Sequence, residues 1–289
     1  MVNGESIYIL INHDATRRDF LDLGILRHLL QLCPQRVVLI SPAFREQKFL
    51  EQALIDKRVT VQPVPALSER RLYYHWRKFR KRCSNAGWLA WHDWRLERCL
   101  LDVSGFTAMF RSQPAAAVVL THPGLLSDRF AEIAARSMGI RTVGMLASWD
   151  HVPKGLLAHP DVLGVWNGID QQGAIEKEGY RREATRVIGP TSFDPYFRPE
   201  TLKSRGEFLA SLGLDPRKKT ILLATGGPIF ELAQASWLEE LLQARRQGRF
   251  PVPVQFVCRT HPYDQMLQFM KYVGSSEVHL DYHTRFSPV

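Results

Sequence analysis

Residues 116 to 146, AAVVLTHPGLLSDRFAEIAARSMGIRTVGML, decide the fold class. The segment begins with a short apolar run (116–122), continues with apolar positions at helical spacing (129–139), and ends with a second short apolar run (141–146). Two such strands separated by one helix predict a parallel pair joined by a right-handed crossover. Alternating strands and helices indicate an α/β protein.

The same alternation extends in both directions along the chain. Upstream, strands and helices alternate over 6–12, 19–33, 36–42, 47–55 and 59–64. Downstream, a second series of strand, helix and strand occupies 218–227, 231–248 and 252–262. For 289 residues, a prior of ~150 residues per domain suggests two domains. We therefore predict two Rossmann-like doubly wound parallel-sheet domains, 1–195 and 218–289, with an interdomain connection at 196–217 and ligands in a cleft at the carboxyl ends of the strands.

The composition limits the functional classes. The chain has no run of ~18 apolar residues, and its N-terminus lacks the basic start and cleavage site of a signal peptide. We therefore expect a cytoplasmic protein. The four cysteines are scattered without CxxC spacing, so the sequence indicates neither a zinc site nor a disulfide framework.

The net charge of +9 is concentrated in one segment. Residues 68–82, SERRLYYHWRKFRKR, hold seven Lys and Arg against one Glu, and Leu72, Trp76, Phe79 and Cys83 fall on one helical face. Trp88, Trp91 and Trp94 follow. A basic, tryptophan-rich amphipathic helix is typical of an anionic membrane surface, so residues 68–94 are a candidate membrane-binding segment. Alternatively, its apolar stripe packs on its own domain, or its charges bind nucleic acid; no nucleic-acid-binding module accompanies them.

Polar residues follow five of the predicted strands. They are NHDATRRD (12–19), THPGLLSD (121–128), SWDHVPKG (148–155), ATGGP (224–228) and RTHP (259–262). Binding residues of doubly wound folds lie on such loops at the carboxyl ends of strands. The five strand ends are therefore the candidate binding regions.

Several of these segments resemble the motifs of a known group. The chain resembles bacterial GT-B glycosyltransferase-like proteins of surface-polysaccharide assembly in three motifs that follow one another in the usual order of that group: SWDHVPKGLL (148–157), VLGVWNGIDQQGAIEKEGY (162–180) and RVIGPTSFDPYF (186–197). It also resembles their N-terminal loop and helix in TRRDFLDLGILRHL (16–29) and their C-terminal Arg-x-His-Pro element in CRTHP (258–262). Related elements occur in teichoic-acid-type glycerophosphotransferases and nucleotide-sugar 2-epimerases. His151 stands where that group usually has Asn. The resemblance implies a GT-B fold whose second domain, at 72 residues from Lys218, is only partial.

On the predicted donor side, the candidates are Gly226, Gly227, Arg259 and His261. Glycine lets the backbone approach a ligand closely, and N–H groups at a helix start suit a diphosphate. Arg259 supplies a fixed charge for phosphate, while His261 binds phosphate or protonates the leaving diphosphate. The alternatives are a plain tight turn at the glycines and a histidine that caps the Pro262 turn.

On the predicted acceptor side, an inverting glycosyl transfer needs a base within reach of the acceptor hydroxyl. The candidates are Asp14, Asp19, His122, Asp150 and His151. We favour Asp150, because the neighbouring Trp149 would stack on a sugar ring and lower local solvation. The alternative is that Ser148 and Asp150 cap a turn and Trp149 belongs to the core.

Further residues complete the predicted acceptor side. Arg17 and Arg18 follow the first strand and would meet an anionic acceptor group, and His122 and Lys154 would contact the same ligand. The predicted catalytic residues are Asp150, His151 and His261. We expect no metal and no cofactor, since the nucleotide sugar is itself a substrate.

The predicted function is transfer of a sugar from a nucleotide-activated donor to a surface-polysaccharide or glycolipid acceptor. The alternatives are a CDP-glycerol-type glycerophosphotransferase, a nucleotide-sugar 2-epimerase-like enzyme, and a non-catalytic GT-B-like binding module or fragment. The expected partners are the nucleotide sugar, the acceptor and the anionic inner face of the cell membrane. We expect no nucleic acid as a partner.

Overall fold

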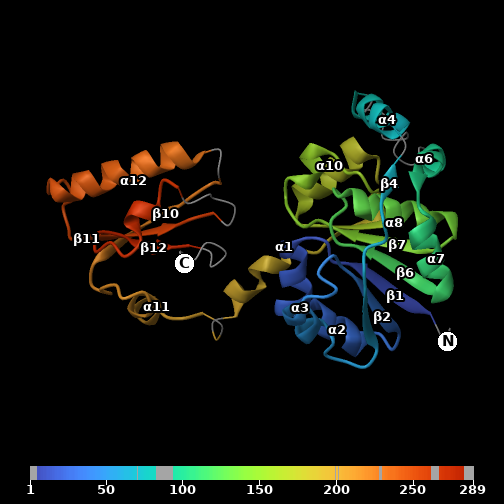
Figure 1. Cartoon of the computed structure of the whole chain (residues 1–289), viewed down its shortest axis with the longest axis horizontal. Coiled ribbons are helices and arrows are strands. Elements are labelled where there is room, and N and C mark those ends of the chain that lie inside the picture. The colour runs from blue at the N-terminus through green and yellow to red at the C-terminus, as the bar shows by residue number, and fades with distance from the viewer. Residues whose placement is uncertain are drawn as a thin grey trace. The chain divides into compact units, whose positions relative to one another are not determined.

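The computed structural model describes residues 5–69, 71–82, 94–198, 200, 202–227, 230–261 and 267–282. The chain divides into two compact units, residues 1–197 and 198–289 (Figure 1). Each contains a parallel β-sheet with helices packed against it.

The larger unit is built on a parallel sheet with seven strands among the described residues. Their order is β3-β2-β1-β6-β7-β8-β9. The strands are β1 (Ser6–Leu10), β2 (Arg36–Ile40), β3 (Val59–Gln62), β6 (Ala115–Leu120), β7 (Arg141–Met145), β8 (Val162–Val165) and β9 (Thr185–Val187). A short antiparallel pair, β4 (Ser68–Glu69) and β5 (Leu101–Asp102), is separate from it.

The strand order reverses between β1 and β6. From β1 the chain continues outward through β2 and β3, and it then returns to β6 on the other side of β1 and continues outward through β7, β8 and β9. Strand β1 pairs in parallel with both β2 and β6. In open parallel sheets, ligands bind outside the carboxyl ends of the strands at such a reversal.

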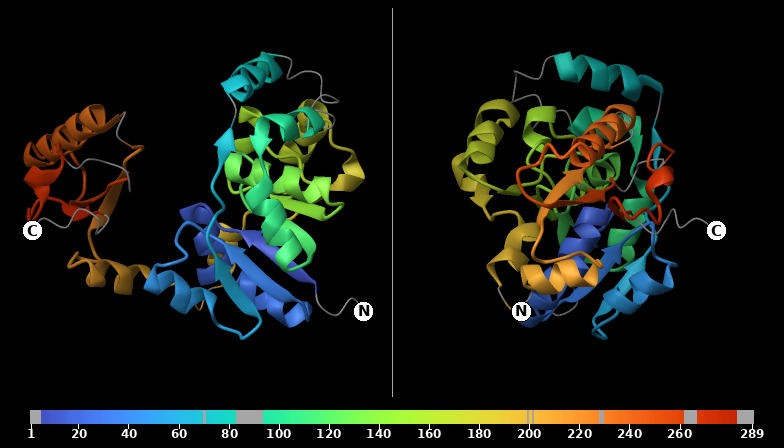
Figure 2. Two further views of the ribbon diagram at one scale, coloured as in Figure 1. Left: turned by 45° about the vertical axis from the view of Figure 1, so that its right-hand side comes forward. Right: turned by 90° about the vertical axis from the view of Figure 1, so that its left-hand side faces the viewer.

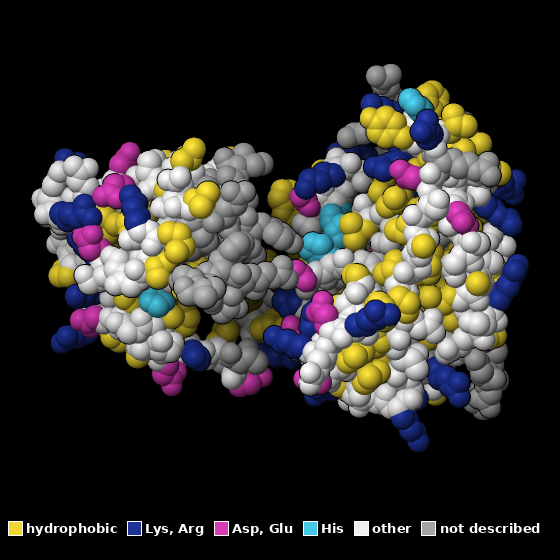
Figure 3. All heavy atoms as spheres, viewed as in Figure 1, with side chains coloured by type: hydrophobic (Ala, Val, Ile, Leu, Met, Phe, Trp, Pro, Cys, Tyr) yellow, Lys and Arg dark blue, Asp and Glu magenta, His cyan; other side chains and the backbone are white. Residues whose placement is uncertain are grey.

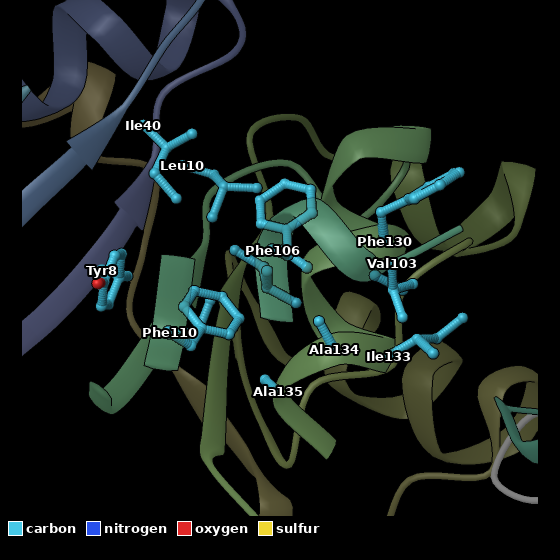
Figure 4. Packing of buried hydrophobic residues seen from close by; sticks show 14 of the residues in the cluster. Tyr8, Leu10, Ile40, Val103, Phe106, Phe110, Phe130, Ile133, Ala134 and Ala135 are labelled. Atoms are coloured by element: carbon cyan, nitrogen blue, oxygen red, sulfur yellow. The ribbon is translucent and has the colours of Figure 1, made fainter. Parts of the chain in front are cut away.

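Helices cover both faces of this sheet (Figure 2). They are α1 (Asp14–Arg17), the π-helix η1 (Arg18–Asp22), α2 (Ile25–Leu32), α3 (Gln47–Ala53), α4 (Arg71–Arg82), α6 (Trp94–Leu100), α7 (Ser104–Ser112), α8 (Leu126–Ser137), α9 (His151–Lys154) and α10 (Gly168–Glu178), with the 3₁₀ helices η2 (Arg182–Ala184) and η3 (Thr191–Phe197). Alternate residues of β1 face opposite sides of the sheet. Tyr8 and Leu10 pack against α7 and α8 (Figure 4). Ile9 packs against α2 and α3.

A buried group of ion pairs connects α6 to α8. The fully buried Arg129 donates to Glu97 over 2.6 Å and to Glu132 over 2.8 Å. Trp76 of α4 donates its indole N–H to the same Glu97 over 2.9 Å. The basic helix α4 is therefore attached to the domain through the buried Glu97.

The face of α4 that packs on the core matches the predicted apolar face only at Trp76 among the described residues. Tyr73 is fully buried and Trp76 is partly buried against the core, whereas Leu72 is 67% and Phe79 53% exposed. The helix thus packs on its own domain and still presents apolar side chains to solvent. Cys83, Trp88 and Trp91 of the predicted segment, and Pro262, lie outside the described residues.

The smaller unit contains a three-stranded parallel sheet within the described ranges, in the order β10-β11-β12. Its elements are α11 (Arg205–Ser211), β10 (Lys219–Ala224), α12 (Glu231–Arg246), β11 (Val254–Arg259), the 3₁₀ helix η6 (Met270–Tyr272) and β12 (His279–Asp281). Leu238 and Leu242 of α12 pack on Phe256 and Cys258 of β11. This arrangement of strand, helix and strand is half of a doubly wound sheet.

Two elements differ from the sequence-based expectation. The segment 19–33 is not one helix, because Gly24 adopts φ +88° and separates the π-helix η1 from α2. Within the predicted connection, 205–211 form helix α11, whose Ser204 and Glu207 make a reciprocal capping box.

Candidate functional site

Three histidines gather where the order of the larger sheet reverses. His13 follows β1, His122 follows β6 and His151 follows β7, and these three strands are neighbours. The ring centroids of His13 and His122 lie 5.2 Å apart, and those of His122 and His151 lie 4.2 Å apart. Figure 3 shows histidine side chains gathered on the visible face of this unit. We call His13, His122 and His151 the histidine cluster.

Burial and proximity keep two imidazoles of this cluster neutral. Burial, followed by the charges of His151 and His13, lowers the pKa of His122 to about 4. Burial also lowers the pKa of His151, although the Asp150 charge opposes that shift. His151 is only 8% exposed. At neutral pH these two rings therefore act as uncharged donors and acceptors.

Two ring nitrogens of the cluster lack hydrogen-bond partners among the described residues. They are Nδ1 of His122 and Nδ1 of His151, both buried. The buried Oδ1 of Asn12, next to His13 in the chain, also lacks a partner. Buried polar atoms without partners are rare in folded proteins and each needs an explanation, such as a ligand or water.

A buried carboxyl group, Asp128, holds the loop of His122. Its Oδ1 accepts the His122 backbone N–H over 3.0 Å, and its Oδ2 accepts from Ser127 Oγ over 3.3 Å and Asn12 Nδ2 over 3.4 Å. Burial raises the pKa of Asp128 to about 7. The hydrogen bonds come from neutral donors, which only partly offset the burial.

The motif SWDHVPKG supplies His151 to the cluster, and the two charged residues of the motif, Asp150 and Lys154, are paired with each other. Asp150 forms an ion pair with Lys154 one helical turn away, and hydrogen bonds from Lys154 and Ser148 lower the pKa of Asp150. Asp150 does not cap helix α9 with its side chain, and Trp149 is 63% exposed. Two parts of the alternative are therefore wrong: the Asp150 side chain does not cap the helix, and Trp149 does not belong to the core.

Arg17 and Arg18, predicted to meet an anionic acceptor, both have acidic partners. Arg17 donates to Glu46 over 3.0 Å and stacks over the Phe49 ring at 5.3 Å. Arg18 pairs with Asp19 over 2.8 Å. An anionic ligand would have to displace these carboxylates.

Two other base candidates lie on the same helical segment. Asp14 is in the exposed first turn of α1, whose N-cap is His13. Asp19 is 7% exposed, and its burial raises its pKa while the Arg18 hydrogen bond opposes this shift. The ion pair with Arg18 makes Asp19 a structural carboxylate of the π-helix.

In the smaller unit, the structure brings Gly226, Gly227 and His261 together. Thr225 N donates to the Arg259 carbonyl over 2.9 Å, and His261 N donates to Thr225 Oγ1 over 2.6 Å. Gly227 has φ +103°, and a Cβ there would lie 3.6 Å from Nδ1 of His261. A larger residue at this position would be strained by the positive φ, while its Cβ would make an ordinary contact with the imidazole.

Two donors of this second strand-end site, the Gly226 N–H and the Arg259 side chain, already have partners. Gly226 N–H donates to Oε1 of Gln234 over 3.0 Å. The Arg259 side chain, 68% exposed, pairs with Asp281 of β12 at 3.5 Å. To bind these two donors, a diphosphate would have to displace Gln234 and Asp281.

Sequence reasoning missed His13, Asn12 and Asp128 as members of one site. The signals were the polar strand ends NHD and THPGLLSD, which are neighbours only because β1 pairs with β6. Among the described residues no group of three or more His, Cys, Asp or Glu side chains is placed to hold a metal ion.

No protein-family model matches the chain, and no curated protein matches it in sequence. Solved structures do match. The S. aureus MnaA–UDP structure is 12% identical, with a TM-score of 0.56 over 96% of this chain and 68% of that one. The UDP-GlcNAc 2-epimerase from Neisseria meningitidis bound to UDP-GlcNAc is also 12% identical, with a TM-score of 0.56 over 97% and 73%.

A glycosyltransferase from Rickettsia africae has a similar fold, with 8% identity and a TM-score of 0.52 over 97% of this chain and 69% of that one. Together with the two parallel-sheet units, these similarities show that the chain has the GT-B fold. The resemblance drawn from the sequence motifs is confirmed at this level.

Proposed function

We propose that this chain is a GT-B enzyme that binds a nucleotide-activated sugar and transfers the sugar to a surface-polysaccharide or glycolipid acceptor. The observation that carries the proposal is the position of the histidine cluster and Asp150 at the reversal of strand order in the larger sheet. The proteins of similar fold support it, since MnaA was solved with UDP and the Neisseria enzyme with UDP-GlcNAc.

In the proposed inverting transfer, the acceptor oxygen bonds to the anomeric carbon while the bond to the nucleotide diphosphate breaks. The acceptor proton passes to a base. His151 suits this role better than Asp150, because its neutral imidazole has an unpaired Nδ1 whereas Asp150 is held by Lys154. The Asp150 charge opposes the lowering of the His151 pKa by burial and so strengthens that base.

On the donor side, Gly226 and Gly227 would admit the diphosphate close to the backbone. Arg259 would exchange its Asp281 partner for a phosphate oxygen, and His261 would donate a proton to the leaving diphosphate. The neighbouring positions of Gly227 and His261 support this assignment.

The alternatives differ in their products. A 2-epimerase-like enzyme inverts the configuration at C2 of the sugar without an acceptor. The Neisseria protein of similar fold is named as such an enzyme. A glycerophosphotransferase uses CDP-glycerol. A non-catalytic module or fragment would bind without turnover.

The test uses the full chain and a panel of UDP-sugars and CDP-glycerol. Thermal unfolding identifies the bound donor, because a ligand at 100 times its dissociation constant adds ~2.7 kcal/mol. Proton NMR of the donor with a lipid-linked glycan acceptor then identifies the product. Transfer with release of nucleoside diphosphate supports the proposal, whereas an epimerised sugar, glycerophosphate transfer or binding without turnover refutes it in favour of the corresponding alternative.

Two matched variants assign the base. His151→Asn removes the imidazole, and Asp150→Asn keeps it but withdraws the charge that raises its pKa. We expect a loss of kcat on the order of 10²–10⁴-fold for His151→Asn. A larger loss of kcat in Asp150→Asn would assign the base to Asp150 instead.

We also propose that residues 68–94 bind the anionic inner face of the cell membrane. Leu72 and Phe79 are exposed on α4, beside the exposed Arg77 and Lys78. Each Lys or Arg near an anionic surface contributes on the order of 1 kcal/mol. No helix within the described part of the chain is long and apolar enough to cross a membrane.

Vesicle sedimentation tests this second proposal. The full chain should sediment with vesicles containing phosphatidylglycerol and not with neutral phosphatidylcholine vesicles. Replacing the five basic residues in the second half of α4 with Gln should abolish the binding; they are Arg77, Lys78, Arg80, Lys81 and Arg82. A matched variant with five other exposed cations replaced, namely Lys57, Lys177, Arg181, Arg182 and Arg186, controls for total charge. Unchanged binding in the α4 variant would exclude the proposal.

A further inference from the structure

The histidine cluster differs from a phosphate-binding site in its charge. Phosphate sites supply cations and backbone N–H groups, whereas burial holds His122 and His151 uncharged. The nearby cations are paired, Arg18 with Asp19 and Lys154 with Asp150. The groups left without partners are therefore neutral.

The unpaired atoms are the ones a hydroxyl group satisfies. A neutral imidazole carries one donor and one acceptor nitrogen, and a hydroxyl group both donates and accepts. Nδ1 of His122 and Nδ1 of His151 are buried without hydrogen-bond partners among the described residues, as is Oδ1 of Asn12. A ligand with several adjacent hydroxyl groups would remove the cost of these unpaired atoms.

We propose that the histidine cluster, with Asn12, is a subsite for a neutral sugar or polyol, recognised through hydroxyl groups that hydrogen-bond to Nδ1 of His122 and Nδ1 of His151. This inference rests on the proposed transferase function. It adds that the sugar at the reacting end of the acceptor carries no charge. Arg17 and Arg18 then have a structural role beside the site, because Glu46 and Asp19 hold them.

The subsite also selects against anions. A uronate or phosphate brought to this place would face imidazoles that must take up protons against burial and against one another. It would also compete with the carboxylates that hold the nearby cations. A neutral sugar meets neither cost, so the difference in affinity follows from the arrangement of the cluster.

The experiment observes the ring nitrogens directly. The full chain, labelled with ¹⁵N at histidine, is titrated at pH 7.5 with glucose, galactose, rhamnose and N-acetylglucosamine, and separately with glucuronate and inorganic phosphate. We expect at least one neutral sugar to move the Nδ1 resonances of His122 and His151. No movement with any neutral sugar, or tighter binding of glucuronate or phosphate at these nitrogens, overturns the proposal.

Variants separate ligand recognition from folding. His122→Phe keeps a ring and removes the nitrogen, whereas His122→Asn keeps a polar atom near the position of Nδ1. We expect ~tenfold weaker sugar binding for His122→Phe and a smaller loss for His122→Asn. His28→Phe, at an exposed histidine of α2, is the matched control. Equal affinity of His122→Phe and the parent chain overturns the proposal.

Titration of the same samples with UDP distinguishes the two proposals. Sugar-induced shifts without UDP binding would refute the proposed nucleotide-sugar enzyme and leave the subsite standing. UDP binding without sugar-induced shifts would overturn the subsite and leave the proposed enzyme.

Discussion

The buried carboxyl of Asp128 makes the larger unit sensitive to pH, and Asp128→Asn should remove that sensitivity. Asp128 is fully buried, and its pKa is raised from 3.8 to about 7. The folded state therefore binds the proton more tightly than the unfolded state. The contribution of Asp128 to the free energy of unfolding is fully present below the unfolded-state pKa, and it is lost as the pH rises from that pKa toward the folded-state pKa.

The magnitude follows from the shift. One pKa unit corresponds to ~1.4 kcal/mol, so a rise from 3.8 to about 7 predicts a total loss of ~4 kcal/mol between those pH values. Within the accessible window of about pH 5.5 to 7.5, the loss is ~2 kcal/mol. An asparagine in place of Asp128 cannot ionise, so the variant should not show this slope.

The asparagine also fits the local hydrogen bonds. Its Oδ1 still accepts the His122 N–H, and its Nδ2 can donate to Oδ1 of Asn12, which has no partner among the described residues. In the parent chain, Nδ2 of Asn12 faces Ser127, so the Asn12 amide must rotate. Oδ1 of Asn12 then accepts from the new Nδ2 at position 128 and from Ser127 Oγ. We therefore expect the variant to fold.

The assay is urea denaturation at several pH values, followed by far-UV circular dichroism and fitted with separate transitions for the two units. The free energy of unfolding of the larger unit in Asp128→Asn, minus that of the parent chain, should rise by ~2 kcal/mol from pH 5.5 to 7.5. The exposed Asp102→Asn is the matched control and should show no such rise. Parallel curves for Asp128→Asn and the parent chain would refute the reasoning.

Two further variants test the ion pairs of each unit. Glu97→Gln leaves the buried Arg129 guanidinium with one carboxylate fewer and should destabilise the larger unit by roughly 3 kcal/mol in urea denaturation; a loss below ~1 kcal/mol would contradict the structural role of the pair. Arg259→Ala should weaken nucleoside-diphosphate binding by on the order of 1.5–3 kcal/mol in calorimetry, while the exposed Arg217→Ala should not, and equal affinities would remove Arg259 from the donor site.

The strands of the fold could be predicted because parallel strands are buried on both faces. Such strands appear in the sequence as short, nearly continuous apolar runs, as in β2 and β6. The broken helix at Gly24 could not be predicted with the same ease, because a glycine inside a periodic apolar pattern is compatible with a continuous helix. Its positive φ depends on how η1 and α2 pack on β1 and β2.

The composition of the site was harder to predict than the fold. His122 and His151 were candidates because they follow strands in the polar segments THPGLLSD and SWDHVPKG. His13 joins them only because β1 and β6, which are more than 100 residues apart, are neighbours in the sheet. Asp128 stands six residues after His122 and holds its loop through a backbone hydrogen bond, a role that residue type and spacing do not reveal.

The charged side chains at the strand ends of the two units differ in how easily an anionic ligand can displace their carboxylate partners. A charged side chain at a strand end looks like a ligand-binding group in the sequence, yet Arg17 and Arg259 both pair with carboxylates. The Arg259 pair is long and exposed, so an anion can displace Asp281 at low cost. Arg17 is 22% exposed and also stacks on Phe49, so an anion gains less by displacing Glu46. This difference in pairing is the physical basis for the proposed anionic ligand of the smaller unit and for the proposed recognition by neutral imidazoles in the larger one.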